Sequence, residues 1–230
     1  MKRILGVVVA AALVVGVFAG VEVSSAEVVL DGGFVVDGTV LVRYEGSEEH
    51  VVIPDGVTEI GEMAFEGCDK IVSVEIPKEV SIIGYRAFAE CSLLVSVDIP
   101  DGVTDIGPSA FGGCALESVS IPEGVEAIWE YTFYKCTSLV SVNISEGVET
   151  IGSWVFEDCI SLVYVNIPES VKTIWQGAFK GTSIYIPESV ETFGLTFWDY
   201  EEQAMVYISP FDDDTTLNCN RGQLRSVMGG

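Results

Sequence analysis

The sequence predicts a repeat solenoid of about seven coils, each 22 or 23 residues long, with a parallel β-sheet along one face. The first observation is a phenylalanine that recurs at this interval, at Phe65, Phe88, Phe111, Phe133, Phe156 and Phe179. The second is an Ile-Pro pair, or a close variant, that recurs ahead of it in the same phase. A repeat of this length cannot bury its own apolar face, so neighbouring coils must supply the core.

The full repeat reads V-x-I-P-x-x-V-x-x-I-G-x-x-A-F-x-x-C-x-x-L-x-S and stays in phase from Val51 to about Phe197, where the last copy is degenerate. Burial of roughly six apolar side chains in one coil contributes at most about 3 kcal/mol each. Ordering the backbone costs about 1 to 2 kcal/mol for each of some 23 residues. A single coil is therefore not expected to fold alone. We assign residues 51–208 to one solenoid, with residues 205–208 as an eighth, terminal strand.

Residues 1–26 differ in composition from the rest of the chain. Lys2 and Arg3 precede a nearly uncharged run, and the segment ends in Ser24, Ser25 and Ala26. This pattern is typical of a secretory signal peptide that is cleaved after Ala26. The alternative is an uncleaved membrane anchor, because about 18 apolar residues lie near the lower limit for a span. We expect a secreted or cell-surface protein.

The two flanks of the solenoid have different patterns. Asp37 and Gly38 lie between alternating apolar residues, which is the strongest short-range signal for a β-hairpin. We expect residues 27–50 to form an N-terminal hairpin cap over the open edge of the first coil. Residues 209–230 are polar, and we expect a C-terminal tail there.

The chain is strongly acidic, with 11 basic and 35 acidic residues and a net charge of −24. Such a surface repels nucleic acid and anionic membranes, so neither is expected as a partner. It favours solubility, it fits adaptation to high salt, and it attracts basic partners. Composition leaves these three interpretations open.

Five of the six cysteines hold one repeat position, three residues after the phenylalanine: Cys68, Cys91, Cys114, Cys136 and Cys159. Neighbouring coils lie about 4.8 Å apart, which is within the range that a disulfide spans, so a ladder of bridges is conceivable. Free, buried cysteines that fill the core are the favoured interpretation. No metal site is expected, because there is no C-x-x-C pair and His50 is the only histidine.

No catalytic constellation stands out. A Ser-His or Cys-His dyad would have to use His50, which lies beside two glutamates in the strand of the first coil. Carboxylates recur in every coil without a distinctive pair, and no Gly-rich phosphate motif follows a strand. We interpret the chain as a non-enzyme that needs no cofactor.

Strand alternation indicates a candidate binding surface. In the strand around Val142 and Ile144 the apolar residues point inward, so the residues between them point outward in every coil. The outward candidates are Glu75, Asp98, Asn143, Asn166, Tyr164, Tyr185 and Tyr207. Exposed tyrosines on a rigid sheet suit recognition of a protein or glycan, although tyrosine is also simply a good strand former. An alternative patch on the opposite side contains Trp129 and Trp175, for which core or edge packing is the other explanation.

The repeat, as it stands at residues 51–68 and 74–91, resembles the BspA-like, Treponema-type leucine-rich repeats, and the resemblance covers roughly residues 34–197. It implies a leucine-rich repeat fold in an extracellular or cell-surface protein that acts in adhesion to matrix proteins or other cells. This chain is short, and valine or isoleucine often replaces leucine. We expect a secreted or cell-surface, non-catalytic recognition or adhesion module for an extracellular protein or glycan. The alternative is a structural or envelope component, adapted to high salt, without a specific ligand.

Overall fold

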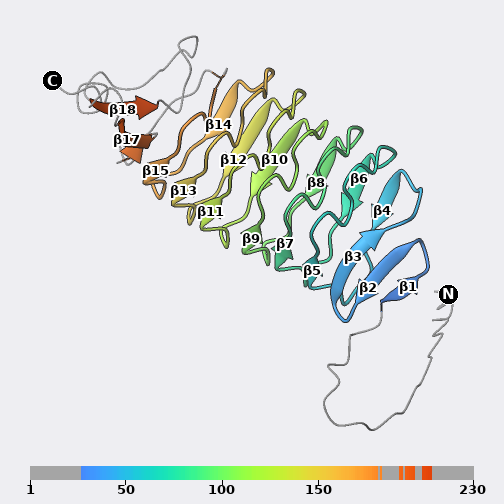
Figure 1. Ribbon diagram of the computed structural model, residues 1–230. Coiled ribbons are helices and arrows are strands. Elements are labelled where there is room, and N and C mark those ends of the chain that lie inside the picture. Colours follow the sequence, from blue (N-terminus) through green and yellow to red (C-terminus); the bar gives the residue numbers. More distant parts are fainter. Residues whose placement is uncertain (1–26, 181, 183–191, 194, 200–203, 209–230) are drawn as a thin grey trace, which may run out of the picture.

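The computed structural model describes residues 27–180, 182, 192–193, 195–199 and 204–208. The chain winds into a stack of coils in which short strands of successive coils lie side by side (Figure 1). The described residues form strands and turns and contain no helix. The predicted solenoid is confirmed, whereas the predicted signal peptide and C-terminal tail lie outside the described residues.

The N-terminal cap consists of β1 (Val28–Leu30), β2 (Phe34–Asp37) and β3 (Val40–Tyr44), which pair in antiparallel fashion. The hairpin turn is at Gly38, where φ is 62°. Strand β3 then pairs in parallel with β5 (Glu59–Ile60) of the first coil. The predicted hairpin cap is confirmed, and it covers the edge of the first coil with backbone hydrogen bonds as well as side chains.

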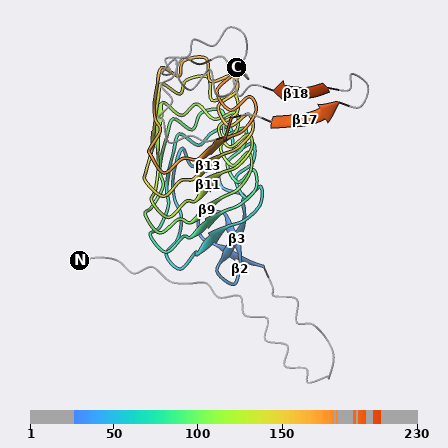
Figure 2. The ribbon, with the colours of Figure 1, turned by 90° about the vertical axis from the view of Figure 1, so that its left-hand side faces the viewer.

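Two columns of parallel strands run along the stack, and they lie on different faces of it (Figures 1 and 2). The first column comprises β4 (His50–Val52), β6 (Ser73–Glu75), β8 (Ser96–Asp98), β10 (Ser118–Ile121), β12 (Ser141–Ile144) and β14 (Tyr164–Asn166). The second comprises β5 (Glu59–Ile60), β7 (Ile82–Ile83), β9 (Asp105–Ile106), β11 (Ala127–Ile128), β13 (Thr150–Ile151), β15 (Thr173–Ile174) and β16 (Thr192–Phe193). The sequence predicted only the first column, because two-residue strands are too short to show alternation.

Both columns are interrupted at the same level of the stack. The first divides into β4-β6-β8 and β10-β12-β14, and the second divides between β9 and β11. The interruption coincides with the one 22-residue interval, in which Cys114 and Leu116 stand one residue closer than Cys91 and Leu94. Hydrogen bonds between turns continue across it, as from the Phe111 N–H to the Thr132 carbonyl at 2.9 Å. The stack is therefore continuous although the strand ladders restart.

The centre of the solenoid is a column of stacked aromatic rings. The six repeat phenylalanines are 0% exposed, and adjacent rings lie 4.8 to 5.6 Å apart between centroids. Tyr44 and Phe34 of the cap extend this column, with centroid distances of 5.1 Å from Tyr44 to Phe65 and 5.1 Å from Phe34 to Tyr44. The cap is thus in phase with the repeats, and the predicted burial of the phenylalanines is confirmed.

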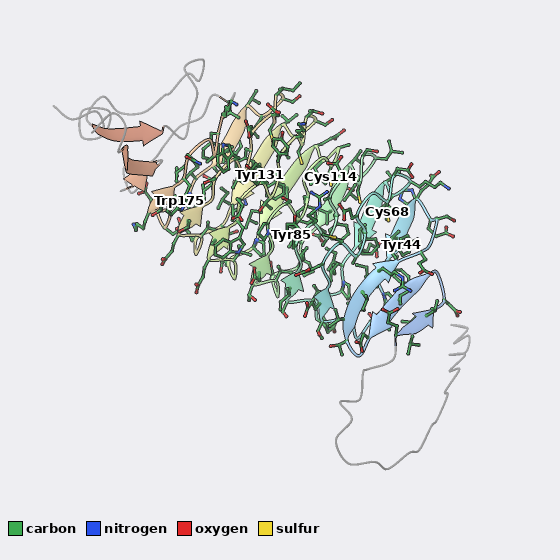
Figure 3. The ribbon with its side chains drawn as sticks, viewed as in Figure 1. Tyr44, Cys68, Tyr85, Cys114, Tyr131 and Trp175 are labelled. Carbon is green, nitrogen blue, oxygen red and sulfur yellow. The ribbon has the colours of Figure 1, made fainter. Side chains whose placement is uncertain are left out.

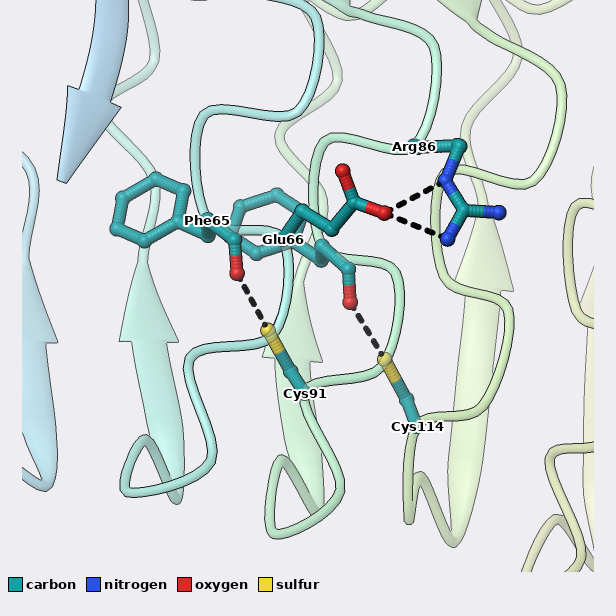
Figure 4. A network of polar contacts seen from close by, with 6 residues as sticks. Phe65, Glu66, Arg86, Cys91 and Cys114 are labelled. Atoms are coloured by element: carbon teal, nitrogen blue, oxygen red, sulfur yellow. Dashed lines mark hydrogen bonds and ion pairs between the residues drawn. The ribbon is translucent and has the colours of Figure 1, made fainter.

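The cysteines form a second internal column. The five described cysteines are free thiols, four of them buried and Cys68, in the first coil, half-buried. Each buried thiol donates a hydrogen bond to a phenylalanine carbonyl of the neighbouring coil, as from Cys91 to Phe65 and from Cys114 to Phe88, both at 3.1 Å (Figure 4). The core-filling interpretation agrees with this geometry. Burial raises the pKa of Cys91 to about 12, so it remains a neutral thiol.

Each coil turns sharply just before its phenylalanine. The residue two positions before the phenylalanine has a positive φ in every complete coil: Met63, Arg86, Ser109, Tyr131, Trp154 and Gly177. Only the last is the glycine that this conformation favours. Arg86, at this corner, donates from Nε and Nη2 to Oε1 of Glu66 in the preceding coil at 2.8 and 2.6 Å (Figure 4).

The last two strands do not continue the solenoid sheets. Strand β17 (Leu195–Asp199) pairs in antiparallel fashion with β18 (Ala204–Ile208), and the two form a separate sheet that projects from the stack (Figure 2). The prediction that residues 205–208 add an eighth strand to the parallel sheet is therefore wrong. Alternation indicates a strand but not its partner, and a connection as short as residues 200–203 favours a hairpin over a further coil.

Candidate recognition surface

The first column of strands presents an outward face along the stack. Val142 and Ile144 are buried, whereas Asn143 between them is exposed, and the same alternation holds in the neighbouring strands. Tyr164 is 57% exposed. The predicted outward orientation is therefore confirmed for Glu75, Asp98, Asn143, Tyr164 and Asn166.

The N-terminal half of this face is acidic. Glu75 and Asp98 occupy the same register position on β6 and β8, so two exposed carboxylates lie side by side. Like charges at such positions repel, and a cation placed between them would relieve that repulsion. His50 lies at the end of this half, where Nδ1 is 2.8 Å from the Ser73 hydroxyl. The histidine therefore has a structural hydrogen-bond partner on the next strand.

The C-terminal half carries amides and a tyrosine. Asn143 and Asn166 are paired in register, and the Asn166 side-chain amide donates to Oδ1 of Asn143 at 3.3 Å. Tyr164 lies on the same strand as Asn166, one outward position away, beside Ser141. This arrangement combines a flat, exposed ring with hydrogen-bonding groups at fixed spacing. Such groups can contact either a peptide or a sugar.

Two predicted members of the face do not join it. Tyr185 lies outside the described residues. Tyr207 lies in β18, which pairs with β17 rather than with β14, so it is not the next outward residue of this column. The candidate surface consists of the five residues on described strands: Glu75 and Asp98 on one sheet, and Asn143, Tyr164 and Asn166 on the next.

The tryptophans of the alternative patch lie on the other column of strands. Trp129 and Trp175 follow β11 and β15 directly and are 45% and 36% exposed. Figure 3 labels Trp175 at the C-terminal end of the stack. They occupy one repeat position two coils apart, and the coil between them has the buried Gly152 there. A Cβ on Gly152 would lie 2.8 Å from the Ile128 carbonyl oxygen, so the backbones leave no room for a side chain.

A third group of residues was missed by sequence reasoning. The rings of Tyr131 and Trp154 stack at 5.1 Å with an angle of 12° between their planes. Tyr134 meets Tyr131 at 5.5 Å and 80°. The sequence does contain a sign of this stacking, because Tyr131 and Trp154 occupy the same repeat position in successive coils. We call these three residues the aromatic corner.

Cavities and ion sites add little to these surfaces. A cavity of about 190 Å³ lies at the N-terminal end, lined in part by Tyr44, Glu48, Cys68 and Lys70. It is smaller than the roughly 300 Å³ of ordinary ligand pockets. Within the described ranges, no three His, Cys, Asp or Glu side chains come together as metal ligands. No helix in that part of the chain is long and apolar enough to span a membrane.

Comparison with known proteins supports the repeat assignment. The pattern of the BspA type Leucine rich repeat region matches residues 43–115 and 104–201, with six copies. A search of curated proteins finds no match.

Among solved structures, a Treponema pallidum leucine-rich repeat protein is similar to this chain, with 33% identity and a TM-score of 0.65; the match covers 74% of this chain and 82% of that one. A leucine-rich cell surface protein from Faecalibacterium prausnitzii has 31% identity and a TM-score of 0.62, over 78% of this chain and 51% of that one. A leucine-rich repeat protein from Bacteroides ovatus has 28% identity and a TM-score of 0.53, over 68% and 49%. This chain belongs to the BspA-type leucine-rich repeat family.

Proposed function

We propose that this protein is a secreted or cell-surface, non-catalytic module that recognises an extracellular protein or glycan through the outward face of its first strand column. Repeats of this family generally act as protein-interaction modules. The observation that carries the proposal is the contrast along each strand, where inward positions are uniformly apolar and outward positions vary in chemistry. Tyr164 is the proposed anchor, with Asn143 and Asn166 beside it and the acidic pair Glu75 and Asp98 at the other end.

The geometry suits recognition because the face is rigid before binding. Its strands are hydrogen-bonded to their neighbours, and the buried ring column fixes the coils that carry them. A preordered surface loses little conformational entropy when a partner docks. Exposed Tyr164 brings a large contact area with few rotamers to restrict.

Location outside the cell is supported by residues 1–26, whose composition is typical of a secretory signal peptide. The similar protein from Faecalibacterium prausnitzii is described as a cell surface protein. Detection of the protein in culture medium or on intact cells, with an N-terminus at Glu27, tests this part of the proposal. A retained Met1 would contradict cleavage and favour an anchored form.

The binding face is tested by capture from extracellular extracts on immobilised protein. We expect a protein or glycoconjugate that is retained by the wild type and by Tyr85→Ser, whose tyrosine is 39% exposed away from the first column. Its affinity for Tyr164→Ser should fall about thirtyfold, because an anchor typically contributes 2 kcal/mol or more. Equal retention by Tyr164→Ser would contradict this binding face. Absence of any retained partner would favour a structural or envelope component.

A further inference from the structure

The aromatic corner, Tyr131, Tyr134 and Trp154, lies after the second strand column and is separate from the proposed recognition face. The rings of Tyr131 and Trp154 are stacked, and Tyr134 meets Tyr131 at a steep angle. All three side chains are half-buried, so each keeps part of its ring surface open to solvent. Figure 3 shows Tyr131 among the side chains of the middle coils.

The corner is held rigidly. Tyr131 and Trp154 have φ values of 59° and 54°, a conformation that bulky residues rarely adopt unless their surroundings impose it. In the next coil the same position is Gly177, where a Cβ would lie 2.6 Å from Nε1 of Trp154. The indole therefore stacks on Tyr131 with one face, and its edge at Nε1 lies against Gly177. Rings fixed in this way form a preorganised platform.

Carboxylates surround the corner. Glu130 precedes Tyr131 in the chain, and the Glu157 carbonyl accepts a hydrogen bond from the Lys135 N–H at 2.9 Å. Burial is the main cause that raises the pKa of Tyr131, and Glu157, Tyr134 and Glu130 raise it further. The pKa of Lys135 is raised chiefly by its hydrogen bond with Tyr134, and the charges of Asp158 and Glu90 raise it further. Among the described residues, Lys135, Lys180 and Arg86 are the cations that interact with these four acids, so the acids are in excess. Glu157 is the acid paired with Lys180, at 2.8 Å.

One ammonium group of the protein, that of Lys135, already lies over an aromatic ring of the corner. Nζ of Lys135 lies 5.0 Å from the ring centroid of Tyr134. An ammonium within about 6 Å of a ring face is attracted by the ring's negative quadrupole. Lys135 thus shows the kind of group that the corner accepts.

We propose that the aromatic corner binds the side chain of an arginine or lysine in a basic segment of a partner protein. Trp and Tyr faces attract cations, and a guanidinium also stacks on them. The surrounding carboxylates and the net charge of −24 attract basic partners over a distance. A neutral sugar could stack on the same rings but would gain nothing from the carboxylates, so a cationic ligand fits better.

The test measures binding of a labelled penta-arginine peptide to the full chain at about 150 mM salt, where long-range attraction is screened. A penta-citrulline peptide, which has the same shape without charge, is the matched probe. We expect Tyr131→Leu and Trp154→Leu each to weaken penta-arginine binding about fivefold to tenfold. Trp175→Leu, which removes an exposed tryptophan elsewhere, should leave the affinity unchanged.

A second variant does not depend on the packing of the rings. Lys135→Gln frees the face of Tyr134 and should tighten penta-arginine binding at least threefold. Lys172→Gln removes the same charge at an exposed site, where Nζ donates to the Glu169 carbonyl at 3.1 Å, and should have a smaller effect. The proposal is overturned if Lys135→Gln has no larger effect than Lys172→Gln, if the ring variants bind like the wild type, or if penta-citrulline binds equally well. Because the probe is a peptide, these results are independent of whether the recognition face finds its partner.

Discussion

Replacement of Phe111 by alanine should destabilise the whole solenoid. The ring is 0% exposed and is stacked between Phe88, at 5.3 Å, and Phe133, at 5.6 Å, with interplanar angles of 3° and 4°. Truncation of a buried phenylalanine costs about 3 to 5 kcal/mol. Each lost aromatic pair adds about 0.5 to 1.5 kcal/mol beyond burial. We expect a loss near the upper end, about 5 kcal/mol.

For a chain of this size, about 5 kcal/mol corresponds to a fall in Tm of roughly 10 to 20 °C. Thermal unfolding followed by circular dichroism measures it, with urea unfolding as a check. Tyr85→Ala, which removes a 39% exposed ring, is the control and should change stability by no more than about 0.5 kcal/mol. If Phe111→Ala unfolds within about 3 °C of the wild type, the stacked ring column does not hold the coils together.

Three further outcomes are expected. Burial raises the pKa of Cys91 and Cys136 to about 12 from an ordinary value near 9, so between pH 9 and 12 the folded state binds more protons than the unfolded state. The free energy of unfolding should therefore fall by about 1.4 kcal/mol per pH unit for each thiol over this range. Alanine at either site should reduce that slope when urea unfolding is measured at a series of pH values. Gly177→Ala should cost more than Gly67→Ala in urea unfolding, because both have positive φ but only Gly177 lies against the Trp154 indole, and equal costs would contradict that packing. Thiol titration of the denatured, non-reduced chain should find at least five thiols; two or fewer would establish disulfides.

The repeat pattern predicts the part of the fold that depends on periodic burial. The phenylalanine column, the cysteine column and the inward residues of the first strands all recur with one phase, so a single sequence shows them. The cap hairpin was predictable from Asp37 and Gly38, because turn chemistry is local. These features need only spacing and residue type.

Other features depend on contacts that spacing does not reveal. The second strand column consists of two-residue strands, such as Ile82–Ile83, whose pairing shows only in the stacked coils. The corner conformation of Tyr131 and Trp154 contradicts local preference, because stacked coils impose a positive φ that an isolated residue avoids. Tyr207 was assigned to the wrong sheet because alternation does not specify which strand is the partner.

The candidate recognition face was only partly accessible to sequence reasoning. Exposure of Asn143 and Tyr164 followed from alternation, whereas the hydrogen bond between Asn143 and Asn166 required the register of β12 and β14. The aromatic corner was missed because Tyr131 and Trp154 differ in residue type. Their shared repeat position becomes informative only when the coils are stacked.

Photo-crosslinking tests the central claim most directly, because it identifies which face touches the partner. A photoreactive phenylalanine analogue replaces Tyr164 on the recognition face or, in a second protein, Tyr85, which comes two residues after β7 of the second column. Both proteins are irradiated with the captured partner or with the extracellular extract. We predict a crosslinked product from position 164 and none from position 85. Crosslinking from position 85 alone would contradict recognition through the first strand column.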